Sequence, residues 1–168
     1  MNKCTEIKLY NVLFPLWFLI WIPSYLWLLL IPLNYILDSI VTWYTIRELP
    51  DAKHFCLKHS WKICIAGFLS DLLGSAILLI ITQLSYEFSS EALEKIADGI
   101  TFNPFNNIAS FMICMIAVVF SGALIYLIDR KILYKAQLTL EQANKSAKWL
   151  ALITAPYLFM IPSGLLYN

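Results

Sequence analysis

The sequence predicts an all-α integral membrane protein, a polytopic bundle of four to five transmembrane helices in a single domain. Of the 168 residues, 60% are apolar and only 14% are charged, and the mean hydropathy is +0.71. A soluble domain carries about 25% charged residues, because its surface must be polar. The apolar residues also fall into blocks long enough to cross a bilayer. These observations exclude a soluble fold, a disordered chain and a secreted disulfide scaffold.

The first apolar block, residues 9–46, is too long to be one transmembrane helix. As a single helix it would extend about 57 Å, whereas the hydrocarbon core of a bilayer is about 30 Å thick. The residues at which it can break are Pro15, Pro23 and Pro32. A break at Pro23 gives a short leading helix and then a full span, and a break at Pro32 gives the full span first. We expect a hairpin of either form rather than a first helix lying in the interface.

The other apolar blocks are predicted as single spans over residues 61–84, 108–128 and 149–167. The segments between spans are predicted as loops over residues 47–60, 85–107 and 129–148. Within the second loop, Ser90 is the expected N-cap of a short helix. In the third loop, Thr139 and Gln142 have the spacing of a capping box that opens another short helix.

Loop charges predict the orientation of the spans. Basic residues are abundant in loops 47–60 and 129–148. Loop 85–107 is acidic, and Lys95 is its single basic residue. The positive-inside rule therefore places the first and third loops in the cytoplasm and the acidic loop outside. Lys3 and Lys8 favour an amino end on the inside. That location requires the first block to cross twice, which gives five crossings.

Two acidic residues inside the predicted spans, Asp38 and Asp71, are the main candidates for a functional site. At about 1.5 Å per residue they lie about 12 and 15 Å from the inner ends of neighbouring antiparallel helices, and therefore at similar depth. No Lys or Arg lies in the interior of any predicted span, since Lys62 stands at the inner end of 61–84, and an ionised carboxylate in the membrane is costly. The pair can share a proton or hold a cation. In the alternative interpretation, each is neutral and bonds a backbone carbonyl or a serine.

Polar and small residues near these acids complete the predicted site and its packing. We assign Asn34, Ser70 and Ser121 to an ion- or solute-binding site together with the two acids. Small side chains at helical spacing let helix backbones approach in lipid. The spans over 61–84 and 108–128 each carry a stripe of such side chains, so we expect these two spans to touch along them. The residues assigned to this packing are Gly67, Gly74, Ser110, Cys114 and Ala117. This contact would turn Asp71 towards the protein interior.

A short stretch with His54, Cys56 and His59 supplies three metal-binding side chains within the first predicted loop. Their spacing matches no zinc motif, so we favour a basic interfacial stretch beside anionic headgroups and predict no metal site there. Zincin, serine-hydrolase and Walker A motifs are also absent from the sequence. We therefore expect no cofactor and no enzymatic activity.

Four stretches of the chain resemble a family of small polytopic membrane proteins of Gram-positive bacteria. They are residues 8–15, 31–39, 103–107 and 155–159. The resemblance implies a location in a bacterial plasma membrane. It carries no activity and no functional residues.

We expect a small membrane protein that binds or passes a proton, a cation or a small solute. The lipid bilayer is the expected environment, and a net charge of +1 argues against a nucleic-acid partner. The chain is small for a complete transporter. We therefore expect a homo-oligomer or a larger membrane complex, whose other subunits complete the wall of the transport path. The first alternative is a non-enzymatic accessory, assembly or immunity-type protein that docks a partner. The second is a membrane-embedded lipid-modifying enzyme.

Overall fold

The structure is a computed structural model that describes residues 27–88 and 90–163. This part of the chain is all-α and contains no strand, which confirms the predicted helical class. The longer helices are α1 (Trp27–Ile46), α2 (Ala52–Glu87), α3 (Glu91–Phe102), α4 (Ile108–Lys135) and α5 (Leu140–Ile153). Two short 3-10 helices are η2 (Pro104–Asn106) and η3 (Tyr157–Met160).

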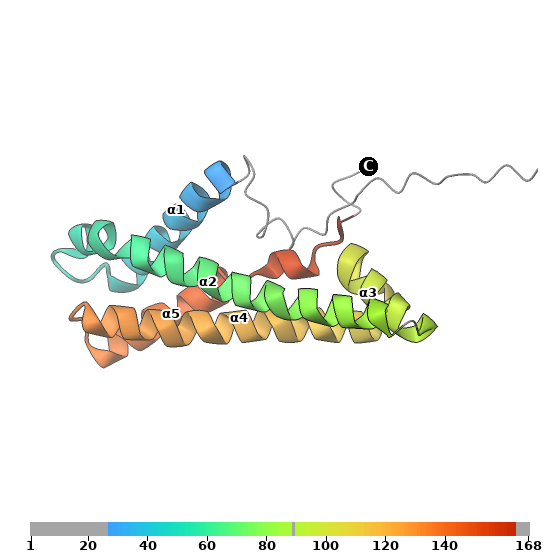
Figure 1. Ribbon diagram of the computed structural model, residues 1–168. Coiled ribbons are helices and arrows are strands. Elements are labelled where there is room, and N and C mark those ends of the chain that lie inside the picture. Colours follow the sequence, from blue (N-terminus) through green and yellow to red (C-terminus); the bar gives the residue numbers. More distant parts are fainter. Residues whose placement is uncertain (1–26, 89, 164–168) are drawn as a thin grey trace, which may run out of the picture.

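The long helices α2 and α4 run side by side and form the axis of the molecule (Figure 1). At one end α1 packs against α2 and α5 packs against α4, and at the other end α3 folds back beside α2 and α4 (Figure 1). Within the described residues, α1, α2 and α4 are long and apolar enough to cross a membrane. The membrane class is thus supported by three helices, fewer than the four to five spans predicted from the sequence.

The amino-terminal block contains one span-length helix among the described residues. Pro32 lies inside α1 and does not end it, so a break at Pro32 is wrong. Proline removes one backbone hydrogen bond of the helix interior, and α1 continues through Pro32 despite that cost. The predicted hairpin needs the residues around Pro15 and Pro23, which lie outside the described part of the chain.

Helix α2 begins much earlier than the sequence patterns suggested. Only residues 47–51 connect α1 to α2, so most of the predicted loop 47–60 is helical. This stretch has no Gly or Pro after Pro50. Its buried residues Ala52, Cys56, Ser60 and Ile63 are spaced at helical intervals and face the core.

The carboxyl-terminal region differs from the single span predicted over 149–167. The capping box of Thr139 and Gln142 is present and starts α5 at Leu140, within the predicted loop. Helix α5 then ends at Ile153, and the chain turns at Pro156 into η3. The expectation of one continuous helix through this block is therefore wrong, and Pro156, which lacks a backbone N–H, lies in the turn that separates α5 from η3. Residues 164–168 lie outside the described part.

The short helix predicted in the second loop is present as α3, and Ser90 is its N-cap residue, although the Ser90 side chain makes no capping hydrogen bond. At the start of α4, the Asn107 side chain caps the helix by accepting a hydrogen bond of 2.8 Å from the Ala109 backbone. Ser110 Oγ donates to the Ile96 carbonyl at 2.9 Å and so joins α4 to α3.

Small residues allow α2 and α4 to approach closely. Ser121 Oγ donates to the Ser70 carbonyl oxygen at 3.1 Å. A Cβ added to Gly74 would overlap Ser121 Oγ and would lie 3.3 Å from the carbonyl oxygen of Ala117. The other predicted glycine does not take part: among the described residues, no atom lies within 4 Å of a Cβ built on Gly67.

The two remaining small residues of α4 are also buried, at its end near α3. Cys114 belongs to the apolar core there. Ser110 lies against α3, where a Cβ added to Gly99 would overlap it. Ser110 thus makes close contact with α3, which the sequence analysis did not predict, and its contact with the span over 61–84 stays a prediction.

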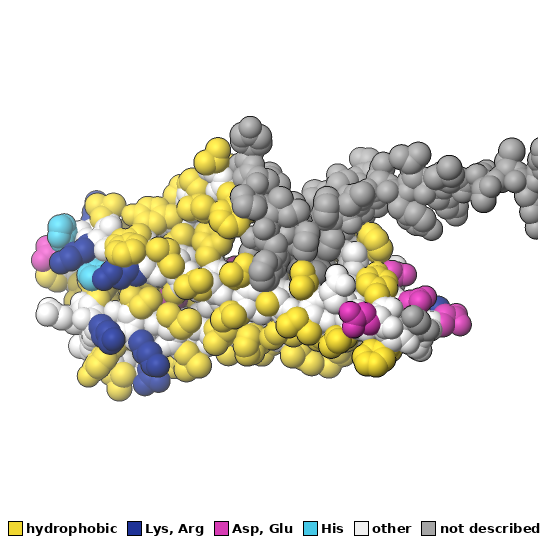
Figure 2. All heavy atoms as spheres, in the orientation of Figure 1, with side chains coloured by type: hydrophobic (Ala, Val, Ile, Leu, Met, Phe, Trp, Pro, Cys, Tyr) yellow, Lys and Arg dark blue, Asp and Glu magenta, His cyan; other side chains and the backbone are white. Residues whose placement is uncertain are grey.

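Charged side chains gather at the two ends of the molecule and apolar side chains cover the middle (Figure 2). Lys, Arg and His lie at the end formed by the α1–α2 and α4–α5 connections, and Asp and Glu are concentrated around α3 (Figure 2). We call these the basic end and the acidic end. An apolar band between two polar ends is the surface that a membrane-spanning bundle requires.

Candidate functional site: carboxylates between the helices

Asp38 lies on the inner face of α1. It is 4% exposed, and Thr42 and Thr45 follow it along the same buried face. Their spacing matches one side of an α-helix, so all three side chains point into the bundle. Thr45 Oγ1 lies 2.6 Å from Ser146 Oγ of α5, and this hydrogen bond ties the inner face of α1 to α5.

Asp71 lies on α2 and borders a cavity of about 250 Å³ between α1, α2 and the segment after α5. Asn34 and Leu37 line the cavity from α1, and Thr154 lines it from the segment that follows α5. We call this the α1–α2 cavity. Asp71 Oδ1 is buried and has no hydrogen-bond partner among the described residues. The structure thus brings the predicted site residues Asn34 and Asp71 to one cavity.

Asp129 is a third buried acid, and the sequence analysis placed it in a loop. It lies within α4, between the core residues Ile125 and Leu133, and is 1% exposed. Neither of its carboxylate oxygens has a hydrogen-bond partner in the described structure. The signal that could have identified it is its regular spacing with Ser121, Ile125 and Leu133 on one helix face. The adjacent Arg130 and Lys131 obscured that spacing.

The three carboxylates belong to one electrostatic system. Asp38 interacts electrostatically with Asp71 on α2 and with Asp129 on α4. Within the described part of the chain the single ion pair joins Lys95 to Glu91 on α3, so no basic side chain is paired with any of the three. Burial away from water is the larger cost of ionising these carboxylates, and repulsion from Asp38 adds to that cost at Asp71 and at Asp129.

Two hydroxyl groups near the basic end are also buried without partners. Thr42 Oγ1 and Ser60 Oγ are fully enclosed and make no hydrogen bond to any described residue. Thr42 follows Asp38 by one turn of α1. Ser60 lies on α2 between Cys56 and Ile63, which share an apolar core with the neighbours of Asp129. Buried oxygen atoms without hydrogen-bond partners in the described structure therefore lie on α1 and α2 as well as on α4.

The predicted helpers Ser70 and Ser121 have a different position. Ser70 Oγ donates to the Ala66 carbonyl at 2.8 Å, and Ser121 Oγ donates to the Ser70 carbonyl. Neither residue lines the α1–α2 cavity. Their hydroxyl groups are used in backbone hydrogen bonds, so both serines serve helix packing in this structure.

The stretch with His54, Cys56 and His59 lies on the first turns of α2. His54 is exposed and Cys56 is buried, so the two side chains lie on different faces of the helix. No group of three metal-binding side chains occurs among the residues that the structure describes. Cys56, Cys64 and Cys114 are buried free thiols, and Cys4 lies outside the described residues.

No protein-family model matches the chain, and it matches neither a curated protein nor a solved structure. The resemblance to a family of Gram-positive membrane proteins therefore stays a prediction.

Proposed function

We propose that this protein binds protons or small cations at Asp38, Asp71 and Asp129 and passes them from one acid to the next along the interior of the helix bundle. The observation that carries the proposal is the position of Asp38, which interacts with acids on two other helices. None of the three is ion-paired within the described chain. A proton or cation bound at one of these acids would relieve the repulsion that links Asp38 to each of the other two.

The surrounding atoms suit such a ligand. Carboxylate, amide and hydroxyl oxygens are the groups that bind hard cations and that relay protons. Asn34 supplies an amide beside Asp71. Thr42 and Ser60 supply buried hydroxyl groups without partners among the described residues. In a low-dielectric interior, polar groups that lack partners gain strongly from a ligand that satisfies them.

The acids are arranged along the bundle and not at a single level. Ser121 bonds to Ser70, so Asp71 is nearly level with Ser121 of α4. At about 1.5 Å per residue, Asp129 lies about 12 Å farther along α4 towards the basic end. Asp38 interacts with both, so it would form the middle step between the α1–α2 cavity and Asp129.

The proposal includes a location and an assembly. We place the protein in a bacterial plasma membrane, with the basic end in the cytoplasm and the acidic end outside, following the positive-inside rule. The charge distribution in Figure 2 supports this orientation. Apolar side chains of α1, α2 and α4 are widely exposed, and we propose that lipid and further subunits of a homo-oligomer or a larger complex cover them.

Flux measurements in proteoliposomes test the proposed function. We expect the wild-type protein to pass protons or a monovalent cation, and we expect Asp38→Asn, Asp71→Asn and Asp129→Asn each to abolish the flux. Glu94→Gln is the matched control, because Glu94 is an exposed acid of α3. Normal flux in all three Asn variants would overturn the proposal. Absence of flux from the wild-type protein, together with co-purification of a partner, would instead identify an accessory protein.

A further inference from the structure

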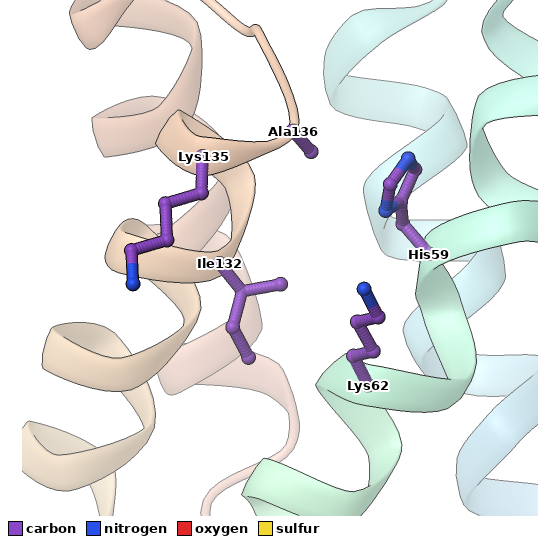
Figure 3. A pocket seen from close by; sticks show the side chains of 5 residues that line it. All are labelled: His59, Lys62, Ile132, Lys135 and Ala136. Atoms are coloured by element: carbon purple, nitrogen blue, oxygen red, sulfur yellow. The ribbon is translucent and has the colours of Figure 1, made fainter.

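A second cavity, separate from the carboxylates, lies at the basic end between α2 and α4. It has a volume of about 150 Å³ and is lined by His59, Lys62, Ile132, Lys135 and Ala136. Figure 3 shows His59 and Lys62 extending from α2 into the gap between the two helices. Ile132 and Ala136 face them from α4, while the amine of Lys135 is turned away along α4. We call this cavity the basic pocket.

The basic pocket has positive charge without a matching acid. No Asp or Glu lines it. Lys62 and Lys135 form no ion pair with any residue the structure describes. The Lys135 side chain has four rotatable bonds, so its amine can turn back towards the pocket from the α4 side. An anion in the pocket would therefore meet Lys62 and His59 directly, with Lys135 within reach.

The surroundings of the basic pocket point to a lipid rather than a soluble anion. Trp61 and Tyr134, the neighbours of Lys62 and Lys135 in sequence, are 50% and 57% exposed. The Lys62 amine lies 5.5 Å from the centre of the Trp61 ring. Exposed Trp and Tyr mark the headgroup level of a membrane protein. Trp61 and Tyr134 therefore place the pocket at the headgroup level, where the charged end of the molecule meets its apolar surface.

We propose that the basic pocket binds the phosphate of an anionic phospholipid headgroup. Lys62 would supply the charge, His59 an N–H donor, and Ile132 a contact for the start of an acyl chain. Basic pockets between transmembrane helices are suited to such headgroups, and each lysine near an anionic surface contributes about fivefold in affinity. This inference needs only the membrane location and is independent of ion passage through the carboxylates.

Lipid retention tests the proposal. The full-length protein is extracted from vesicles of phosphatidylcholine and phosphatidylglycerol in equal amounts, and its bound lipids are measured by native mass spectrometry. We expect wild-type protein to retain phosphatidylglycerol preferentially. Lys62→Gln should lower that retention about fivefold, and Lys62→Arg should preserve it. Lys145→Gln is the matched control, since Lys145 is exposed on α5 outside the pocket.

Other outcomes of the same experiment would overturn the proposal. An equal loss in Lys145→Gln would show that general charge, and not the pocket, attracts the lipid. Displacement of phosphatidylglycerol by millimolar inorganic phosphate would assign the pocket to a free anion. Equal retention of both lipids by the wild-type protein would show that the pocket has no headgroup preference. Ion flux is measured on the same variants, so failure of lipid binding is distinguishable from failure of the proposed function.

Discussion

Asp129 is the residue whose burial most needs an explanation. Its carboxylate is 1% exposed, and neither oxygen has a hydrogen-bond partner in the described structure. A buried polar group without a partner costs about 1–3 kcal/mol, and a charged group costs more. Buried ionisable groups that make no stabilising contact are typical of functional sites. Asp129 therefore fits a ligand site better than a structural role.

We predict that Asp129→Asn is more stable than the wild-type protein, although it loses ion passage. The substitution keeps the shape of the side chain and removes its charge, and a neutral amide is cheaper to bury than a carboxylate. The expected gain in the free energy of unfolding is roughly 1–3 kcal/mol. Thermal unfolding in mild detergent, followed by circular dichroism, measures the difference, and Glu94→Gln should leave it unchanged. A lower melting temperature for Asp129→Asn would show that the carboxylate makes a stabilising contact.

At the scale of single elements, the contact between α2 and α4 depends on the absence of a side chain at Gly74. A Cβ there would overlap Ser121 Oγ and would lie 3.0 Å from Phe159 Cε2 and 3.3 Å from the Ala117 carbonyl oxygen. Gly67 lies two turns earlier on the same helix, where no described atom is within 4 Å of an added Cβ. A substitution at Gly67 is therefore a matched control for the same substitution at Gly74, because only Gly74 lies in the close contact.

We predict opposite effects for the two alanine substitutions. Gly74→Ala should destabilise the protein by about 1–3 kcal/mol, because it overpacks a close helix contact. Gly67→Ala should be neutral or stabilising by up to about 1 kcal/mol, since alanine favours helix and meets no neighbour. Unfolding by sodium dodecyl sulfate titration compares them. Ser121→Ala combined with Gly74→Ala should recover part of the loss, and failure to do so would argue against the overlap with Ser121.

Element boundaries show which features the sequence could predict. Apolar length was sufficient to predict α1, α2 and α4 as helices that can cross a membrane, and local capping chemistry correctly predicted the start of α5. Charge was a poor guide to helix ends. Residues 52–60 and 129–135 were assigned to loops because they are charged, yet both are helical. A helix can extend beyond the hydrocarbon core, so its polar ends carry no boundary signal.

The candidate site was predicted incompletely for the same reason. Asp38 and Asp71 stood out as lone acids in apolar blocks, whereas Asp129 precedes Arg130 and Lys131 and so resembled a loop residue. The positions of Asn34 and Thr154 at one cavity depend on how α1 and the segment after α5 meet. Tertiary contacts of that kind leave no trace in hydropathy. The hydroxyl groups of Ser70 and Ser121 were equally ambiguous, since serine serves both packing and binding.

At the scale of the whole molecule, the two polar ends have opposite character. The connections α1–α2 and α4–α5 lie at the basic end, and α3 lies at the acidic end (Figure 2). If α1, α2 and α4 each cross the membrane once, these two ends lie on opposite sides of it. The positive-inside rule then assigns the basic end to the cytoplasm.

We predict that cysteines placed at the two ends react with a membrane-impermeant thiol reagent from opposite sides. In a Cys4→Ser background, Glu94→Cys should be labelled on intact cells, and Lys145→Cys only after permeabilisation. Both positions are exposed, whereas Cys56, Cys64 and Cys114 are buried and should stay unlabelled. Labelling of both new cysteines on intact cells would place the two ends on one side. That result would contradict a spanning bundle, because the apolar lengths of α2 and α4 would then lie along the membrane surface.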